Sequence, residues 1–490
     1  MAILAGMTTP FAWLRSASSR RAVVRRLSQL KEYLVEFRSI HDAFRLSEFR
    51  DCARCAGYTD TVEFQPVIVD PLFKEPVCAY VQLPNDSIAQ QITHRSASVR
   101  NIIEVWGDET CLENLVQSTT TKYFDSFRHH FENLNSEQNT WRVNFRTYGR
   151  AGYSGLDYKQ KVDFLKNFNA VFLDINGTVN LQNPTTKFIY LEDWTEYQNF
   201  SNDLYKASLK SDLQEDLRSA KERIESLQPK RRIFGRQVAK GPKIASTYDV
   251  RYRPYIGTTT MEATIAHIAA NAGSVLDNYF ADELTTAARV MPGETVLDPF
   301  CGTGGLLLPC CHLGAIVTGS DIDADCLGLV DRGILAVNNR SKNSNFIRQN
   351  GYQNLQMNGS TRSNFEFYGF ESQLQDLHAM DASEWLSDNR VETYDVIVSD
   401  PPFGIRERSL GDESRHPLVT LLEIANKRLK CGGRLAFWMP TEAYVEERDV
   451  FQRLKDYSNQ IYSFNLRFVR ATRQELSSKL ERWLCLFERC

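Results

Sequence analysis

This sequence of 490 residues lacks an apolar run long enough to cross a membrane. The longest candidate, residues 304–319, contains Pro309 and His312, whereas a membrane-spanning helix needs about 20 largely apolar residues. An excess of basic charge is also lacking, since the net charge is −3. Any nucleic acid would therefore have to be bound by local basic patches, because the chain as a whole has no positive field.

Regularly spaced cysteines and histidines are lacking as well. The eleven cysteines are odd in number and follow no repeat, which favours reduced thiols in the cytosol or nucleus over a disulfide framework. Cys52 and Cys55 have the spacing of half a zinc site, but no second Cys/His pair follows at ligand spacing. The sequence therefore predicts no metal site, two cysteines on one helix, and a cytoplasmic protein.

A chain of this length exceeds a single hydrophobic core and is expected to form several domains. Residues 1–31 are basic and contain no acid, which is typical of a disordered tail and also resembles the composition of a mitochondrial transit peptide. Strand-like and helix-like patterns then predict one α+β domain over residues 32–115 and a second over residues 116–200.

Residues 201–250 are expected to form a charged helical linker. Leucines at helical spacing between residues 204 and 227 predict an amphipathic helix. The stretch 229–243 that follows contains six basic residues and no acid. It is interpreted either as a flexible linker or import signal, or as a contact to an RNA backbone. On this division, the half that follows is expected to fold without residues 1–200.

Predicted strands and helices alternate over residues 251–490, as in an α/β protein whose doubly wound parallel sheet is covered on both faces. Residues 341–363 are rich in Asn, Ser, Gln and Gly and are interpreted as an inserted loop. The predicted strands are 295–299, 315–320, 377–380, 396–399 and 434–438, with a final pair at 463–469 and 483–487.

A glycine-rich turn follows the first of these strands. The strand ends at Asp298, and Gly302-Thr303-Gly304-Gly305 opens the next helix. Glycines there let the backbone approach a ligand, and the amides of a helix N-terminus can bind a carboxylate. The third glycine of a dinucleotide motif is replaced by Leu307 and the lysine of a P-loop is absent, which disfavours a dinucleotide and ATP.

Acidic residues end three successive predicted strands, the edge at which parallel sheets bind ligands. Asp321 and Asp323 lie about 20 residues after the turn, where an acid commonly binds ribose hydroxyls. Asp381 ends the next strand and would suit an adenine amino group. Each acid could instead cap a helix, an alternative of equal weight for Asp323. The set favours an adenosine-bearing ligand without phosphates, namely S-adenosylmethionine.

The fourth strand leads into Asp400-Pro401-Pro402-Phe403. An exocyclic purine amine is a poor nucleophile because its lone pair is delocalised into the ring. The Asp400 carboxylate and the Pro401 carbonyl could accept hydrogen bonds from this amine. Pro402 would restrict the backbone that carries the carbonyl, and Phe403 could stack on the base. A simple strand-ending turn is the alternative. The motif predicts methyl transfer to a planar amine without a covalent intermediate.

With its motifs in this order, the chain resembles class I methyltransferases that act on amino nitrogens. More narrowly, it resembles the eukaryotic tRNA (guanine(10)-N2)-methyltransferase family of THUMP-containing catalytic subunits, through residues 253–261, 298–305, 319–323 and 400–407. The resemblance implies a Rossmann-like class I methyltransferase domain at residues 251–490. Before it, the resemblance implies a ferredoxin-like domain and a THUMP domain that binds tRNA. It implies cofactor contacts from Asp298, Gly302, Gly304, Asp321, Ile322, Asp381 and Thr260, which stands where a serine is expected.

The family resemblance also implies two partners, tRNA and a small zinc-containing activator subunit that forms a heterodimer with the catalytic chain. Guanosine 10 would have to be extruded from its stem before its N2 could react. Adenine-N6 methylation of DNA or RNA uses the same Asp-Pro-Pro chemistry, but the RNA-binding-like N-terminal half favours tRNA. Glutamine methylation is disfavoured, because those enzymes favour Asn at position 400. A non-catalytic RNA-binding subunit would not need the intact set of Asp298, Asp321 and Asp400.

Overall fold

The structure, a computed structural model, describes residues 30–70, 72–121, 139–149, 156–173, 177–196, 228–257, 260–272, 291–329, 359–402, 416–442, 445–446, 449–450, 452–454 and 464–490. Residues 1–29 of the predicted basic tail, the amphipathic helix after residue 200 and most of the predicted insertion lie outside these residues, whereas Lys31, predicted as the end of the tail, begins a strand. The chain divides into two compact units. The first comprises Met1–Phe37, Asp60–Gln91 and Asn101–Lys240, and the second comprises Arg38–Thr59, Ile92–Arg100 and Gly241–Cys490.

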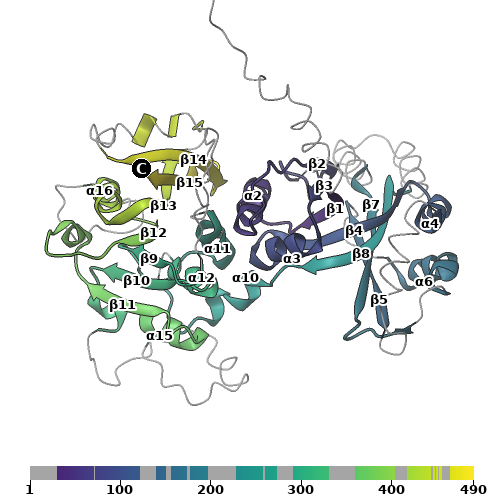
Figure 1. The fold of residues 1–490 in the computed structure, drawn as a ribbon, viewed down its shortest axis with the longest axis horizontal. Coiled ribbons are helices and arrows are strands. Elements are labelled where there is room, and N and C mark those ends of the chain that lie inside the picture. The colour runs from purple at the N-terminus through teal and green to yellow at the C-terminus, as the bar shows by residue number, and fades with distance from the viewer. Residues whose placement is uncertain are drawn as a thin grey trace, which may run out of the picture. The chain divides into compact units, whose positions relative to one another are not determined.

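The first unit is built on an eight-stranded sheet with the order β2-β3-β1-β4-β8-β7-β5-β6. Its strands are β1 (Lys31–Phe37), β2 (Gln65–Ile68), β3 (Cys78–Leu83), β4 (Val99–Glu109), β5 (Thr140–Tyr148), β6 (Thr178–Val179), β7 (Thr186–Asp193) and β8 (Arg231–Lys240). Its helices are α4 (Leu112–Thr121), α6 (Tyr158–Asn167), α7 (Asn169–Leu173) and the first part of α3 (Asp86–Arg95), whose residues from Ile92 belong to the second unit. An aromatic core that includes Phe164, Phe188 and Phe234 joins α6 to β7 and β8, and Figure 1 shows α4 and α6 beside these strands.

Strand β8 lies in the middle of this sheet, where the basic composition indicated a flexible linker. It pairs antiparallel with β4 on one side and with β7 on the other. Ile233 and Phe234 are buried. The guanidinium of Arg236 donates to Glu104 at 2.8 Å and to Asp86 at 2.5 Å. The basic residues are therefore interspersed with core residues along a strand, and part of their charge is neutralised within the sheet.

The second unit contains a seven-stranded sheet with the order β11-β10-β9-β12-β13-β15-β14. Its strands are β9 (Thr295–Asp298), β10 (Ile316–Asp321), β11 (Leu374–Ala379), β12 (Tyr394–Ser399), β13 (Leu429–Glu442), β14 (Leu466–Glu475) and β15 (Leu480–Arg489). Pairs from β11 to β13 are parallel, and β15 is antiparallel to both β13 and β14. The strand order reverses between β9 and β12, which is the switch point of a doubly wound sheet. The predicted fold class is confirmed.

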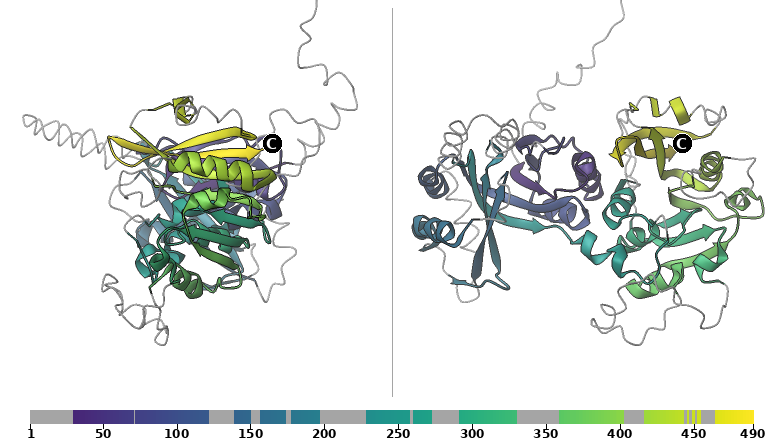
Figure 2. Two further views of the ribbon diagram at one scale, coloured as in Figure 1. Left: turned by 90° about the vertical axis from the view of Figure 1, so that its left-hand side faces the viewer. Right: turned by 180° about the vertical axis from the view of Figure 1, so that it is seen from behind.

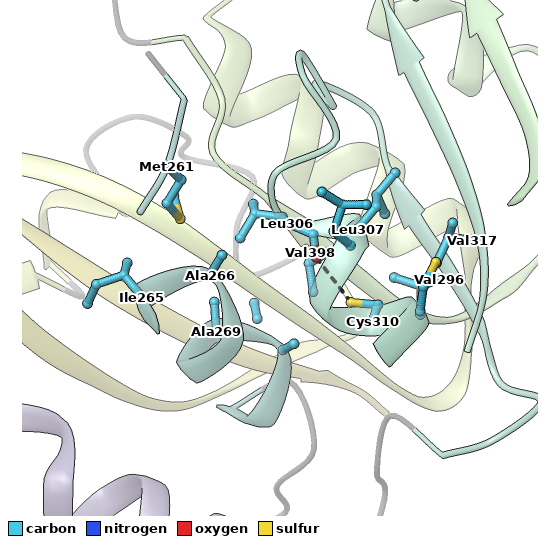
Figure 3. Close-up of a cluster of buried hydrophobic side chains, with 14 of the residues drawn as sticks. Met261, Ile265, Ala266, Ala269, Val296, Leu306, Leu307, Cys310, Val317 and Val398 are labelled. Carbon is cyan, nitrogen blue, oxygen red and sulfur yellow. Dashed lines mark hydrogen bonds between the residues drawn. The ribbon is translucent and has the colours of Figure 1, made fainter. Parts of the chain in front are cut away.

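Alternate residues of these strands face two separate cores, which is why apolar residues directly follow one another, as in Val296-Leu297 and Val396-Ile397-Val398. Val296 and Val398 face helices α11 (Ala263–Ala272) and α12 (Leu307–His312), as Figure 3 shows. Leu297 and Ile397 face the opposite layer, made by the 3₁₀ helix η4 (Ala382–Leu386) and helix α16 (Pro417–Arg428). Figures 1 and 2 show the sheet between these two layers.

A segment of the N-terminal half belongs to this second unit. It contains the 3₁₀ helix η2 (Asp42–Phe44) and helix α2 (Arg45–Cys55), which carries both Cys52 and Cys55 as predicted. The carboxylate of Glu48 is buried and accepts hydrogen bonds from the backbone of Ala97 at 2.7 Å and from the side-chain amide of Asn271 at 2.9 Å. The expectation that the second half folds without residues 1–200 therefore has to be revised.

Two further observations concern the whole described part of the chain. No helix in it is long and apolar enough to cross a membrane. All eleven cysteines fall within it, and each is a free thiol.

Candidate active site

Three of the predicted acidic residues meet at the switch point of the second sheet. Asp298 ends β9 and Asp321 ends β10, while Asp400 directly follows β12. Strands β10 and β12 flank β9 on either side. Because the carboxyl ends of parallel strands share one edge of a sheet, the three carboxylates are brought to the same place.

Asp298 is the buried member of this group. Its Oδ1 accepts hydrogen bonds from the hydroxyl of Ser399 at 2.8 Å and from the backbone N–H of Phe300 at 3.1 Å. Burial raises the pKa of Asp298 to about 7, against these two hydrogen bonds, and the neighbouring Asp400 and Asp321 carboxylates act in the same direction as burial. Ser399, which the sequence analysis did not select, thus ties the first acid of the site to the strand that leads into Asp400.

Replacing Asp298 by Asn is expected to remove a pH dependence of stability. An aspartate in the unfolded chain has a pKa of about 3.9, whereas the pKa of Asp298 in the folded protein is about 7. Between these values the folded state keeps a proton that the unfolded state has lost, so Asp298 makes the wild type less stable as the pH rises. Asn keeps the oxygen that accepts from Ser399 and never ionises.

The melting temperature of D298N, measured against that of the wild type, should therefore rise between about pH 4 and pH 7. Ser399→Ala keeps the carboxylate and serves as the control, in which a pH dependence should persist. Parallel pH profiles for D298N and the wild type would contradict the assignment.

The glycine turn that follows β9 requires glycine at two positions. Gly302 and Gly304 have φ angles of 48° and 76°, in the left-handed region that favours glycine. A Cβ at Gly304 would lie 3.0 Å from the ring of Phe365, whereas a Cβ at Gly302 would meet nothing within 4 Å. The Gly302 N–H donates to Asp321 Oδ2 at 2.9 Å, and Asp321 Oδ1 accepts from the backbone of Asp323 at 3.0 Å. The turn therefore fixes the orientation of the Asp321 carboxylate.

Helix α15 (Thr361–Tyr368) holds this turn through side chains that the sequence analysis missed. The hydroxyl of Thr361 donates to the carbonyl of Gly302 at 2.6 Å. The buried amide of Asn364 donates to the carbonyls of Thr303 at 3.0 Å and Tyr255 at 2.9 Å, and accepts from the Tyr255 N–H at 2.9 Å. Residues 360–363, predicted as part of the insertion, instead cap and begin this helix. The Ser360 capping box is the local signal that could have located it.

Thr260 lies beside the same turn. Its Oγ1 accepts a hydrogen bond from the Gly257 N–H at 2.8 Å and is 3.4 Å from the hydroxyl oxygen of Thr303. The structure thus brings Thr260 together with the predicted glycine turn, although the two are more than 40 residues apart in the sequence. Its role as a cofactor contact stays a prediction.

Two other predicted acids act as helix caps. Asp323 accepts from the backbone of Asp325 at 3.0 Å and of Cys326 at 3.2 Å, in agreement with the capping alternative. Asp381 accepts from the Ser383 N–H at 2.8 Å and forms a capping box at the start of η4. An adenine contact by Asp381 stays a prediction, and it would have to coexist with the cap. Ile322, which lies between Asp321 and Asp323, is 43% exposed.

Asp400 is a partly exposed acid of the site, with 37% of its side chain exposed and the guanidinium Nη1 of Arg482 at 3.8 Å from its Oδ2. Pro401 is buried and Pro402 is half-buried, consistent with a carbonyl held in a fixed direction. Phe403 lies outside the described residues, so its stacking role stays a prediction.

The chemistry of these groups matches a cationic ligand with hydroxyl donors. Asp298, Asp321 and Asp400 would repel a phosphate at short range and would attract a sulfonium or an ammonium group. Their carboxylate oxygens can also accept hydrogen bonds from ribose hydroxyls. The residues present therefore fit the adenosine-bearing ligand without phosphates that the sequence predicts.

Comparison with known proteins gives similarity over both halves of the chain. The model of the Tmrp11 THUMP N-terminal domain matches residues 31–206, and that of the RMKL-like methyltransferase domain matches residues 251–457. The chain is similar to the tRNA (guanine(10)-N(2))-methyltransferase of Saccharomyces cerevisiae, at 28% identity over 84% of each chain. It is also similar to the human protein named tRNA (guanine(10)-N(2))-methyltransferase TRMT11, at 27% identity over 85% of this chain and 82% of that protein. Among solved structures, TrmN from Thermus thermophilus is similar with 13% identity and a TM-score of 0.38, covering 94% of this chain and 100% of that one.

Proposed function

We propose that this chain, which belongs to the tRNA (guanine(10)-N2)-methyltransferase family, methylates the exocyclic N2 amine of guanosine 10 in tRNA. The observation that carries the proposal is the junction of β9 and β12. There Ser399 bonds to the buried Asp298, and the next residue, Asp400, is accessible. The glycine turn after β9 and the Asp-Pro-Pro segment after β12 share one edge of the sheet, which supports a site where a methyl donor and an amine are held side by side.

S-adenosylmethionine is the proposed cofactor, and when bound it supplies the methyl group as a sulfonium. We assign Asp321 to the ribose hydroxyls, since the Gly302 N–H already fixes its carboxylate. Gly302 and Gly304 would let the backbone approach the ligand closely. Asp298 would meet the positive charge of the methionine part, while Thr260, Ile322 and Asp381 would complete the contacts. The fit of the three carboxylates to a cation supports this assignment.

Catalysis would depend on positioning and not on covalent chemistry. The Asp400 carboxylate and the Pro401 carbonyl would each accept a hydrogen bond from one N–H of the amine. This arrangement would direct the nitrogen lone pair towards the methyl group. Pro402 restricts the backbone around that carbonyl. Asp400 would then carry a proton from the amine towards solvent, which its partial exposure supports.

The first unit is proposed to bind tRNA, which its similarity to a THUMP domain supports. Arg142 on β5 and Lys187 on β7 lie directly opposite each other in paired strands, so both side chains are on the same face of the sheet. The chain has a net charge of −3, so such local pairs would have to supply the contact to phosphates. This binding should weaken steeply as salt is added.

A small zinc-containing activator subunit and a cytoplasmic location complete the proposal. The subunit follows from the family resemblance, and the location follows from the cysteine pattern, since eleven free thiols are in keeping with a reducing compartment. Purification of the tagged chain from its own cells, followed by mass spectrometry and zinc analysis, would test the partner. Recovery of the chain without any stoichiometric small subunit would contradict it.

Nucleoside mass spectrometry of tRNA from cells that lack this protein would test the reaction itself. Loss of N2-methylguanosine at position 10, restored by the wild-type gene and not by an Asp400→Ala gene, is the expected result. Loss of N6-methyladenosine instead would transfer the proposal to an adenine substrate. An unchanged nucleoside profile would refute methyl transfer to tRNA.

Asn364→Ala is expected to weaken S-adenosylmethionine binding about 10-fold, which corresponds to about 1.4 kcal/mol. The substitution removes the amide that joins the glycine turn at Thr303 to the backbone of Tyr255. Part of the binding free energy of the cofactor would then be used to order the turn. Calorimetry with the purified protein measures the change.

The matched control is Gln373→Ala. Its amide also bridges two carbonyls, those of Cys311 at 2.6 Å and Ala315 at 3.3 Å, and neither belongs to the turn. The control should lose some stability and keep its affinity for the cofactor. Equal losses of affinity in both variants would assign Asn364 a general structural role only.

A further inference from the structure

The C-terminal hairpin of β14 and β15 brings a cation to the predicted catalytic acid. Arg482 on β15 pairs in register with Pro440 on β13, just beyond the point where Phe437 of β13 pairs with Ser399 of β12. Arg482 therefore lies at the edge of the sheet where Asp400 leaves β12. Its Nη1 is 3.8 Å from Asp400 Oδ2.

The guanidinium of Arg482 is held from two sides. It lies over the ring of Trp438 on β13, with 4.3 Å between its Cζ and the ring centroid, a stacking that favours arginine over lysine. Its Nε donates to Gln474 Oε1 on β14 at 2.6 Å. Only 17% of the Arg482 side chain is exposed, against 37% for Asp400. The cation is thus less exposed than the carboxylate it faces and is held by two neighbouring side chains.

The Trp438 ring is held in place by a residue from the N-terminal half of the chain. The indole is fully buried, and the ring of Phe44 packs edge-on against it with 5.9 Å between centroids. Asp51 on the following helix α2 accepts a hydrogen bond from Arg470 on β14 at 2.9 Å. Residues 38–59 therefore support both the platform under Arg482 and the hairpin that carries it.

We propose that Arg482 is a positioning residue for methyl transfer, which holds the Asp400 carboxylate in the orientation that receives the substrate amine. This inference rests on the proposed function, because it gives Asp400 the role of hydrogen acceptor. The nearby Asp400 carboxylate raises the pKa of Asp298 by charge repulsion, and a cation 3.8 Å from Asp400 counters that repulsion. A carboxylate fixed before the substrate arrives needs no reorganisation in the transition state.

A purely structural role for Arg482, in which it only stabilises the hairpin, predicts a different result. Loss of a structural residue affects stability and all binding steps together, whereas loss of a positioning residue affects the rate of the chemical step alone. The experiment therefore has to separate rate, affinity and stability in the full-length chain, together with its activator subunit if the chain requires one.

Single-turnover methylation of tRNA by Arg482→Gln should be about 10- to 100-fold slower than by the wild type. Its affinities for S-adenosylmethionine and tRNA, measured by calorimetry and filter binding, should change less than about twofold, which corresponds to about 0.4 kcal/mol. Arg482→Lys should recover part of the rate, since it retains a cation without the stacked, forked geometry. Gln474→Leu, which removes only the anchor of Nε, should give a smaller loss than Arg482→Gln.

Arg467→Gln is the matched control, because Arg467 pairs with Glu488 in the same hairpin and 44% of its side chain is exposed. It should keep the wild-type rate. An undiminished rate in Arg482→Gln, or losses in Arg482→Gln and Gln474→Leu that follow their melting temperatures, would overturn the positioning role. An inactive wild type would refute the proposed function itself, so the two failures are distinguishable.

Discussion

Asp400→Ala is expected to abolish methyl transfer and to leave the binding of cofactor and tRNA nearly unchanged. In the proposed reaction the carboxylate acts on the amine as its nitrogen becomes tetrahedral, so it would contribute to the transition state and little to the ground state. Acceptors preorganised in this way contribute on the order of 10²-fold or more to the rate. Because 37% of the Asp400 side chain is exposed, its removal leaves no large cavity and should not unfold the sheet.

Single-turnover rates, with both affinities measured on the same preparation, would check this expectation. Asp400→Asn keeps the shape and one acceptor oxygen, so its rate should fall between those of the alanine variant and the wild type. Asp388→Ala provides a control on the surface of the same unit, where the carboxylate is 94% exposed and pairs with Lys427. A rate for Asp400→Ala above about a tenth of that of the wild type would refute the assigned role.

The sequence was sufficient to predict the sheet of the second unit, because its strands are encoded locally. Short apolar runs such as Val396-Ile397-Val398 are fully buried, and that pattern is typical of strands buried on both faces. The order of acids and glycines along the chain then placed Asp298, Asp321 and Asp400 at one edge. Parallel strands leave no other geometry for residues that follow their carboxyl ends.

Contacts between segments far apart in the sequence could not be predicted from local sequence patterns. Asn364 bonds to Tyr255, 109 residues away, and nothing in the local sequence distinguishes it from the other asparagines near the insertion. Arg482 faces Asp400 across the sheet, and only the register of β13 against β15 brings the two together. Strand β8 was interpreted as a linker because its basic residues are close together in the sequence. The acids that neutralise part of this charge, Asp86 and Glu104, lie in other elements.

A fragment that begins at residue 241 is expected not to fold stably, although it contains every predicted site residue. It lacks α2 and residues 92–100, which pack in the same unit. Arg470 would lose the buried carboxylate of Asp51, and losing one partner of a buried ion pair costs about 3–5 kcal/mol. Asn271 would lose Glu48, and His267 would lose the Arg95 carbonyl, 2.8 Å from its Nε2. The deletion also removes Phe44 from the core and uncovers Trp438, and exposing one such apolar side chain costs about 1.5–3 kcal/mol, which is a large part of the 5–15 kcal/mol stability of a typical domain.

Urea unfolding followed by circular dichroism, with S-adenosylmethionine binding as a measure of the native site, would test this expectation. The full-length chain should unfold cooperatively, and the fragment should show neither a cooperative transition nor binding. In the full-length chain, Glu48→Gln is the corresponding point variant, because its amide cannot accept all the hydrogen bonds that Ala97, Ser98 and Asn271 donate. It should be markedly destabilised, whereas Glu32→Gln, at an exposed hydrogen bond of β1, should not. A fragment that unfolds cooperatively and binds the cofactor like the full-length chain would show that the N-terminal segment is dispensable for the catalytic unit.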